Sequence, residues 1–248
     1  MFSLLKKKGD AAGGLEGLYC DMHSHLIPGI DDGAKDLETS VQLIRGLRAL
    51  GYRKLITTPH INSDGFPNTP AVIRAGLETV REELRRQQID VDLHAAAEYL
   101  IDDGFMTTLE NGETFLTLKD NLLLVEFSFV VPAINVLEIL FDLQVKGYRP
   151  VLAHPERYVY FMSSRGWYDK LRDAGCIFQL NLLSLIGHYG KVSQQLAEYL
   201  IKKNYIDLLG TDLHHEKHLA LLQTPALAKK VHRLLESGLV RNIQLLGD

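Results

Sequence analysis

Short apolar segments alternate with amphipathic segments along most of this chain, and this alternation limits the possible fold more than any other feature. From Leu18 onward the pattern repeats about every 30 residues, which is the period of βα units in a parallel sheet or barrel. Strands are predicted at Leu18–Leu26, Lys54–Ile61, Asp92–Leu100, Leu122–Ser128, Pro150–His154, Ile177–Leu183 and Ile206–Asp212. Helices are predicted at Leu37–Leu50, Ala71–Gln87, Asn135–Lys146, Trp167–Ala174, Ser193–Lys203 and Pro225–Ser237.

These segments amount to about seven βα units, one fewer than in the usual eight-stranded barrel. We therefore expect one α/β domain over residues 18–248. Residues 1–17 contain a basic run and several glycines, and they are predicted to form a flexible extension before the domain.

Composition excludes several classes of protein. The 27 Lys and Arg against 31 Asp and Glu give a net charge of −4, so nucleic acid is not an expected partner. The apolar start Met1–Leu5 is followed by Lys6–Lys8, an order that does not fit a secretory signal, and no window predicts a membrane span. Cys20 and Cys176 have no paired spacing, which fits free thiols in a reducing compartment. We expect a cytoplasmic protein.

Residues of the kinds that bind metal ions stand at the ends of almost every predicted strand. This is the end at which βα barrels build their sites. Residues two apart on a strand share a face, so His23 and His25, with Asp21 behind them, can converge on one ion. The other strand-end residues of this kind are His60, Glu98, Glu126, His154, Asp212 and His214.

Each of these residues has an ordinary explanation when taken alone. A single His in a strand is usually a hydrogen-bonded core residue, and a single Glu at a strand end is usually solvated. Their coincidence at one barrel mouth is different, because so many buried carboxylates without cations would be costly. The sequence therefore predicts a metal cluster.

The ligand set indicates the kind of ion. Oxygen and nitrogen ligands without thiolates suit Mn²⁺, Fe²⁺ or catalytic Zn²⁺, and more than six candidates imply more than one ion. Bridged ions suit phosphoester hydrolysis, because they lower the pKa of a shared water and bind both the attacking and the leaving oxygen. Arg157, three residues after His154, is a candidate to bind phosphate oxygens; the alternative is a salt bridge with Glu156 or another neighbour.

Other mechanisms are excluded by the sequence. A cysteine phosphatase needs Cys-x5-Arg, but Leu26 and Leu182 stand at the arginine positions. The phosphate loop G-x-x-x-x-G-K-[ST], the G-x-S-x-G elbow and G-x-G-x-x-G are absent. The segment His215–His218 has one residue too few for a zincin helix. Histidines predicted not to be ligands are His94, His188, His215, His218 and His232.

The strand-end motifs together resemble those of the polymerase and histidinol phosphatase (PHP) superfamily. Within it they resemble the metal-dependent bacterial tyrosine phosphatases of capsule and exopolysaccharide gene clusters. The resemblance runs from about Tyr19 to near the C-terminus. The motifs are Asp21-Met22-His23-Ser24-His25, Pro28-Gly29-Ile30-Asp31-Asp32-Gly33, Thr58-Pro59-His60, Ala153-His154-Pro155-Glu156-Arg157-Tyr158 and Asp212-Leu213-His214.

The resemblance implies a distorted barrel of seven βα units with three metal ions, Mn²⁺ being the expected ion and Fe²⁺ or Zn²⁺ the alternatives. It adds Asp32 to the ligands and leaves Asp31 as a turn residue. The implied ligands are His23, His25, Glu98 and Asp212 for the first ion, Glu98, Glu126 and His154 for the second, and Asp32, His60 and His214 for the third.

The resemblance also implies a substrate, phosphotyrosine on a partner tyrosine autokinase that drives polysaccharide export. A hydroxide bridging the ions would attack phosphorus while Arg157 holds the phosphate oxygens, and Asp212 and His60 are expected to be catalytic as well. One position departs from the family pattern. Relatives have a second arginine shortly after the Asp-x-His motif, where this chain offers Lys217 or His218 instead.

Two other functions remain open from the sequence. One is a phosphatase for a small molecule such as histidinol phosphate, or a phosphodiesterase of the same superfamily. The other is a non-catalytic module that binds phosphorylated tails. Turnover of a tyrosine-phosphorylated peptide and of histidinol phosphate would separate these possibilities.

Overall fold

Strands and helices alternate along the chain, as the sequence predicts. The computed structural model describes residues 14–131 and 134–247. The strands are β1 (Cys20–Asp21), β2 (Lys54–Thr57), β3 (His60–Ile61), β4 (Asp92–Ala95), β5 (Glu98–Leu100), β6 (Leu122–Glu126), β7 (Arg149–Ala153), β8 (Ile177–Asn181) and β9 (Leu208–Gly210). The helices are α1 (Leu37–Ala49), α2 (Pro70–Arg86), α3 (Asp103–Glu110), α4 (Val136–Val145), α5 (Gly166–Asp173), α6 (Lys191–Lys202), α7 (Glu216–Leu222), α8 (Pro225–Glu236) and α9 (Asn242–Leu246).

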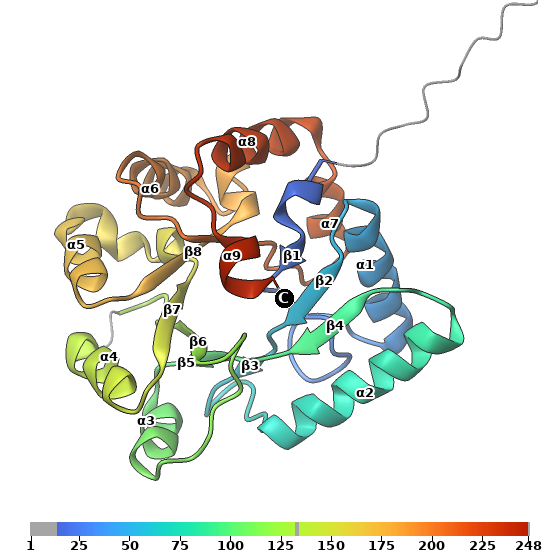
Figure 1. Ribbon diagram of the computed structural model, residues 1–248. Coiled ribbons are helices and arrows are strands. Elements are labelled where there is room, and N and C mark those ends of the chain that lie inside the picture. The colour runs from blue at the N-terminus through green and yellow to red at the C-terminus, as the bar shows by residue number, and fades with distance from the viewer. Residues whose placement is uncertain (1–13, 132–133, 248) are drawn as a thin grey trace, which may run out of the picture.

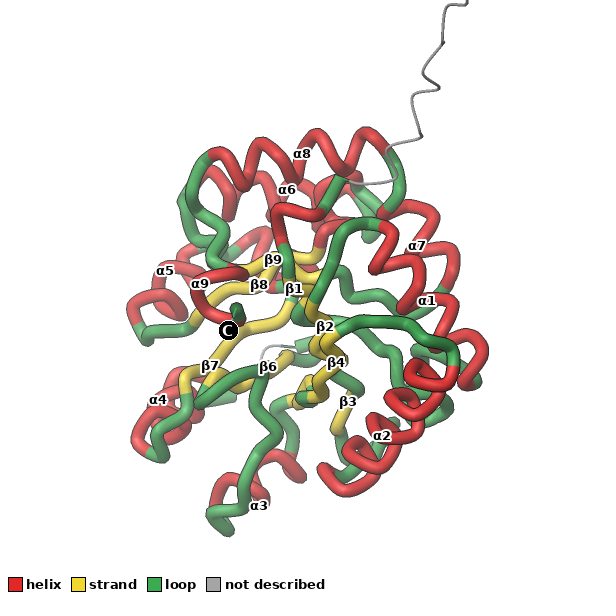
Figure 2. The backbone as a smooth tube through the Cα atoms, turned by 45° about the vertical axis from the view of Figure 1, so that its right-hand side comes forward, coloured by secondary structure: helices red, strands yellow, loops and turns green. Residues whose placement is uncertain are grey.

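The strands form an inner ring with helices outside it (Figures 1 and 2). Parallel ladders run in the orders β1-β2-β4 and β3-β5-β6-β7-β8-β9. The ring closes where Ser24 pairs with Leu213 and where the amide of Asp212 donates to the carbonyl of His23 at 2.7 Å. The predicted α/β barrel is confirmed.

Two predicted strands are each divided into two short strands: Lys54–Ile61 into β2 and β3, and Asp92–Leu100 into β4 and β5. β2 and β3 together make Lys54–Ile61, interrupted at Thr58 and Pro59. Pro59 has no amide hydrogen and cannot continue a ladder. Its carbonyl still accepts from the amide of Glu98 at 3.1 Å, which keeps the neighbouring strands in contact across the break.

Alternation along the strands separates an apolar end of the barrel interior from a polar end. In β6, Leu122 and Leu124 belong to the inner apolar cluster, and Glu126 follows on the same face. β8 repeats this order, with Ile177 in the inner cluster and Gln179 two residues later. The polar side chains of the interior are therefore placed at the C-terminal ends of the strands.

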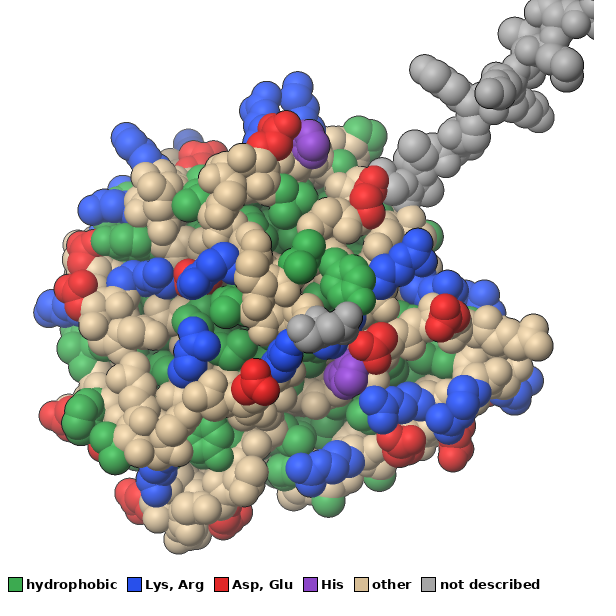
Figure 3. All heavy atoms as spheres, viewed as in Figure 1, with side chains coloured by type: hydrophobic (Ala, Val, Ile, Leu, Met, Phe, Trp, Pro, Cys, Tyr) green, Lys and Arg blue, Asp and Glu red, His purple; other side chains and the backbone are tan. Residues whose placement is uncertain are grey.

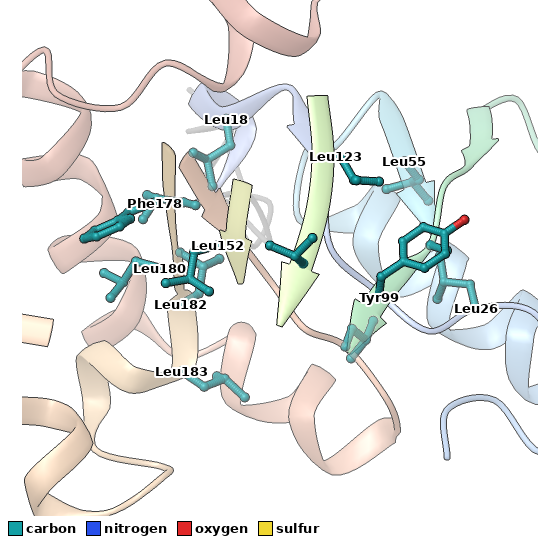
Figure 4. Packing of buried hydrophobic residues seen from close by; sticks show 14 of the residues in the cluster. Leu18, Leu26, Leu55, Tyr99, Leu123, Leu152, Phe178, Leu180, Leu182 and Leu183 are labelled. Carbon is teal, nitrogen blue, oxygen red and sulfur yellow. The ribbon is translucent and has the colours of Figure 1, made fainter. Parts of the chain in front are cut away.

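The outer faces of the strands pack against the helices. Leu123, Leu152 and Phe178, which are labelled in Figure 4, belong to the larger apolar cluster. Helices contribute apolar stripes to the same cluster, for example Ile73, Leu77 and Val80 of α2. Burial of these stripes fixes each helix against the ring.

The start of the described chain is packed on the domain and does not belong to a solvated tail. Leu15 is fully buried, and its amide donates to the carbonyl of Leu50 at 3.2 Å. Glu16–Leu18 forms a 3₁₀ turn. The predicted boundary after residue 17 is therefore too late, while the prediction for residues 1–13 lies outside the described residues.

One end of the barrel is covered by α9, which lies over the centre of the ring in Figure 1. On this face, Lys and Arg are interspersed with Asp and Glu, so that neither sign of charge dominates (Figure 3). Within residues 14–131 and 134–247, no helix is both long and apolar enough to cross a membrane.

Candidate metal centre

All nine residues predicted as metal ligands lie together at the C-terminal ends of the strands. Their ligand atoms fall into groups in which every atom lies within 4.8 Å of the others. The groups are His25, Asp32, His60 and His214; His23, His154 and Asp212; His23, His25 and Glu98; and His60, Glu98 and Glu126. These four groups do not coincide with the three implied sets, because His23, His25, His60 and Glu98 each belong to two groups.

Two of these residues have strained backbones. His154 has φ 34° and Asp212 has φ 50°, in the left-handed region that non-glycine residues rarely adopt. Such strain persists only where the surrounding structure enforces it, and it occurs preferentially at functional sites. Close packing also requires glycine at position 210, because a Cβ there would lie 2.8 Å from the Cβ of His23.

Three imidazoles are oriented through Nδ1. Nδ1 of His23 donates to Oε1 of Gln179 at 2.8 Å, and Nδ1 of His25 donates to Oδ2 of Asp31 at 2.7 Å. In His214, Nδ1 donates to the carbonyl of Asp212 at 2.9 Å. In the neutral form of each ring, a proton on Nδ1 leaves the lone pair on Nε2, which faces the carboxylates, as in metal-binding histidines.

Asp31 orients a candidate ligand, a role that the sequence interpretation missed. It was predicted as a turn residue, but besides His25 it accepts from the amides of His60 at 3.2 Å and Gly33 at 3.0 Å. The signal was available, because the adjacent Asp32 was already a candidate. A single chain does not show which of two neighbouring carboxylates turns inward.

Gln179 and Asn181 were missed as well. Nε2 of Gln179 donates to Oδ1 of Asn181 at 2.9 Å, and Nδ2 of Asn181 donates to Oδ2 of Asp212 at 2.6 Å. This chain of hydrogen bonds connects the acceptor for His23 to a predicted ligand. Two polar residues at a spacing of two in an otherwise apolar strand were the available signal.

Asp21 lies behind the cluster, as the sequence suggests, but belongs to none of the ligand groups. It accepts from the amide and the hydroxyl of Thr211 at 2.9 and 2.8 Å, which ties β1 to the strand that closes the ring. Burial raises the pKa of Asp21 to about 6.

The cluster is strongly charged and buried. Burial would lower the pKa of His23, but the carboxylates of Glu98 and Asp212 raise it to about 9. Burial opposes ionisation of Glu98 as well, yet the charges of His23 and His60 hold its pKa well below the usual range. Carboxylates this acidic are ionised at neutral pH and suited to binding cations.

The donor set fits divalent metal ions. Nε2 of His25, Nδ1 of His60 and Nδ1 of His154 are buried atoms that accept or donate no hydrogen bond within the described residues. Nε2 of His25 lies 3.5 Å from both Glu98 and Asp212. Unpartnered imidazole nitrogens beside carboxylate oxygens are the ligands that Mn²⁺, Fe²⁺ and catalytic Zn²⁺ share.

Arg157 enters the same cavity. Its guanidinium donates to Oδ2 of Asp212 at 2.9 Å and lies between the rings of Phe129 and Tyr189, 4.6 and 4.3 Å from their centres. The alternative partner Glu156 is instead buried, where it accepts from the amide of Asn181 at 3.0 Å. Arg157 is thus held rigidly by aromatic contacts and directed at the cluster.

The histidines predicted not to be ligands fall into two sets. His94 is half-buried and His232 is exposed, and they pair with Asp92 and Glu236. The other three lie beside the cluster without joining its ligand groups, with the ring of His218 3.9 Å from that of His215 and 4.9 Å from that of His188.

The two candidates for the missing second arginine are placed differently. His218 lines the cavity and is buried, and burial lowers its pKa to about 4. Lys217 lies in a neighbouring polar cleft beside Lys35. Only His218 therefore reaches the cavity wall.

The cavity has a volume of about 290 Å³, which is small for a ligand pocket and suits a phosphoryl group with one ring. Anionic ligands would meet Arg157 and metal ions on its floor. Its lining residues are Asp32, His60, Glu98, Glu126, Phe129, His154, Arg157, Tyr189, Asp212, His214, His215 and His218.

Known proteins share this sequence pattern. Residues 19–243 match the family described as "Capsular polysaccharide synthesis, CpsB/CapC". The chain is 31% identical over 198 residues to the tyrosine-protein phosphatase YwqE of Bacillus subtilis, covering 79% of this chain and 78% of YwqE. It is 27% identical over 201 residues to the tyrosine-protein phosphatase CpsB of Streptococcus pneumoniae, covering 79% of this chain and 82% of CpsB.

Comparison with solved structures supports the same family. One from the work on YwqE and CpsB, described there as unique metal-dependent tyrosine phosphatases, matches with a TM-score of 0.77 and 27% identity over 92% of this chain and 88% of that chain. The lactonase Lmo2620 of Listeria monocytogenes shares only the fold, at 11% identity and a TM-score of 0.55 over 94% of this chain and 92% of that one. The resemblance identified from the motifs is confirmed, and the chain belongs to the CpsB/CapC family of capsular polysaccharide synthesis.

Proposed function

We propose that this protein is a metal-dependent protein-tyrosine phosphatase that acts on a phosphorylated tyrosine autokinase in the cytoplasm and thereby regulates polysaccharide synthesis. The observation that carries the proposal is the convergence of nine candidate oxygen and nitrogen ligands in one cluster, seven of which line a small cavity together with Arg157. The names of the relatives YwqE and CpsB support the same activity.

Three divalent ions, expected to be Mn²⁺, would be held in the sets that the family resemblance implies. His23, His25, Glu98 and Asp212 would hold the first, with Glu98 shared by the second; the second would add Glu126 and His154, and the third would take Asp32, His60 and His214. When bound, the ions would lower the pKa of water and neutralise phosphate charge.

The chain's own residues then position the substrate. Arg157 holds the phosphate oxygens. Its guanidinium lies over the rings of Phe129 and Tyr189, which restrict its orientation in the cavity. Gln179 and Asp31 hold the first-ion histidines in the ligand tautomer. The phenolate leaving group has a pKa near 10, so it requires less proton donation than an alkoxide would.

His218 takes the place of the second arginine in this proposal. It lines the cavity, and its buried Nδ1 has no hydrogen-bond partner in the described residues. A neutral imidazole supplies one hydrogen bond but neither the charge nor the fork of a guanidinium. Phosphate binding in this chain therefore depends mainly on Arg157.

One comparison tests the proposal. Turnover with added Mn²⁺ is measured on a tyrosine-phosphorylated peptide, on histidinol phosphate and on a phosphodiester. We expect the peptide to be preferred. A preference for either small substrate would replace this function with the corresponding alternative, and phosphopeptide binding without any phosphate release would make the protein a binding module.

A matched pair of arginine variants tests the site itself. Arg157→Met is expected to lower kcat/KM on the peptide by about 10² to 10³, because one donor to the phosphate is lost. The exposed Arg149→Met serves as the control and should leave turnover unchanged. Equal turnover of both variants would remove Arg157 from the mechanism.

A further inference from the structure

Exposed apolar side chains recur along one stretch of the chain, in the described part of the loop after β6 and on the outer side of α4. Val130 is 83% exposed, Ile134 85% and Val145 69%. Phe141 and Val145 are four residues apart and so share a face of α4. We call this set the apolar ridge; its members are Phe129, Val130, Val131, Ile134, Phe141 and Val145.

The ridge is continuous with the metal cavity. Phe129 lines that cavity, and its ring lies 5.5 Å from the ring of His154. The next two residues along the chain, Val130 and Val131, are exposed. A polypeptide with one side chain in the cavity therefore lies beside Phe129, the first residue of the ridge.

The start of the ridge is held in place by the structure beneath it. The hydroxyl of Tyr158 accepts from the amide of Phe127 at 2.9 Å, and the hydroxyl of Tyr160 donates to the carbonyl of Ser128 at 3.0 Å. The amide of Val130 also donates to the hydroxyl of Ser128 at 3.2 Å. These hydrogen bonds hold the backbone that carries Phe129 and Val130, and exposed apolar side chains on such a backbone are typical of an interaction surface.

We propose that the apolar ridge binds apolar residues that flank the phosphotyrosine in the substrate protein. The inference rests on the proposed function, and it adds that the enzyme recognises a stretch of polypeptide as well as the phosphorylated side chain. α4 is about 15 Å long, which corresponds to about five residues of extended chain. Recognition therefore begins beside the phosphotyrosine and extends about that far along one side.

The charges of α4 favour a protein over a membrane as the occupant. The helix carries Glu138 and Asp142 and no Lys or Arg; Lys146 follows only after its last residue. Anionic lipid surfaces attract basic segments, so these carboxylates oppose membrane docking. A polypeptide with apolar side chains and a lysine or arginine among them complements both features of the ridge.

The experiment compares two tyrosine-phosphorylated peptides of equal length and net charge, one with Leu and Val around the tyrosine and one with Ser and Gly. Free phosphotyrosine is the third substrate. We expect the wild type to show about tenfold higher kcat/KM on the apolar peptide. Val130→Ser with Val131→Ser, and separately Phe141→Ser with Val145→Ser, should remove this preference and leave free phosphotyrosine turnover unchanged.

The control is Ile243→Ser, because Ile243 is exposed on α9 and lies outside the ridge. It should retain the peptide preference. Equal kcat/KM of the wild type on both peptides overturns the inference, as does a loss in the ridge variants that free phosphotyrosine shares. Circular dichroism verifies that all variants are folded.

Three further readouts separate this inference from a failure of the proposed function, from self-association and from membrane binding. Binding of fluorescent versions of both peptides, measured by anisotropy, tests the ridge even where no phosphate is released, so a failed phosphatase activity does not hide the result. If the ridge variants instead change the oligomeric state in sedimentation, a second copy occupies the ridge and the inference is wrong. A ridge-dependent attachment to phosphatidylglycerol vesicles would overturn it in favour of a membrane.

Discussion

Asp31 shows how one carboxylate can orient a candidate metal ligand without belonging to any of the ligand groups. Its hydrogen bond to Nδ1 of His25 leaves Nε2 of that ring facing Glu98 and Asp212. The negative charge also makes the imidazole a stronger ligand. The effect of Asp31 should therefore be visible in metal affinity rather than in folding.

Asp31→Asn is expected to lower Mn²⁺ affinity by about 10 to 100-fold, because the amide keeps the shape of the carboxylate but loses its charge. Chelator competition measures the change. Asp36→Asn is the matched control, since Asp36 caps α1 by accepting from the amide of Thr39 and Asn caps equally well. Equal affinity in both variants would show that Asp31 acts only as a turn residue.

The two cysteines are expected to be inert in the folded protein. Both are buried free thiols, and burial raises the pKa of Cys176 to about 12 and that of Cys20 further. A raised pKa reduces the thiolate, so only about one Cys176 thiol in 10⁴ is ionised near pH 8. Iodoacetamide should label neither cysteine until guanidinium is added, as followed by mass spectrometry. Labelling of the native protein at the denatured rate would contradict this expectation.

At the scale of elements, periodicity predicted the long helices and the eight-residue α5, but it missed the short helices α3, α7 and α9. The bounds of α1 and α2 lie within one residue of their predicted bounds. Both helices were predictable because they present apolar stripes over several turns. α3 and α7 were not predicted, since one or two turns contain too few apolar residues to establish a period. α3 also contains Gly104, which weakens a helix signal.

The candidate site was predictable for a different reason. A parallel barrel brings its strand ends together whatever their separation in sequence, so residues such as His23 and Asp212 could be placed at one rim. Asp31 and Gln179 could not, because their role depends on which side chain each one touches. That these nine residues bind ions stays a prediction.

α3 depends on its N-cap more than on its own composition. Asp102 accepts from the amide of Phe105 at 2.8 Å and from the amide of Ser63 at 2.7 Å, so it caps the helix and anchors the loop after β3. Asp102→Ala is expected to lower the free energy of unfolding by about 1 to 2 kcal/mol. Urea denaturation measures this loss, and Asp103→Ala, which removes only a first-turn charge, should cost less. A larger loss in Asp103→Ala would refute the capping role.

At the scale of the whole molecule, the two ends of the barrel have separate tasks. The C-terminal ends of the strands carry the charged cluster, while the first residues of several strands form an apolar layer with Leu246 of α9. Chemistry concentrates at the first end in barrels of this kind and stability at the second. The residues of that layer are Cys20, Leu122, Ile177 and Leu208.

Asn242 tests this separation. Its Oδ1 accepts from the amide of Leu209 at 2.9 Å, and its Nδ2 donates to the carbonyls of Leu209 at 2.7 Å and Cys20 at 3.2 Å, so one buried side chain joins α9 to β9 and β1. Asn242→Ala leaves these groups unpaired and is expected to cost about 3 kcal/mol in unfolding free energy.

Turnover should hardly change in Asn242→Ala, because α9 covers the end of the barrel remote from the cluster. Urea denaturation and kcat/KM on a phosphopeptide, measured below the unfolding transition, give the two readouts. Gln244→Ala is the control, since Gln244 is exposed on the same helix and should affect neither. A large fall in kcat/KM while Asn242→Ala remains folded would mean that the two ends are coupled, because a rigid ring of strands would then transmit the loss of α9 to the ligands at its other rim.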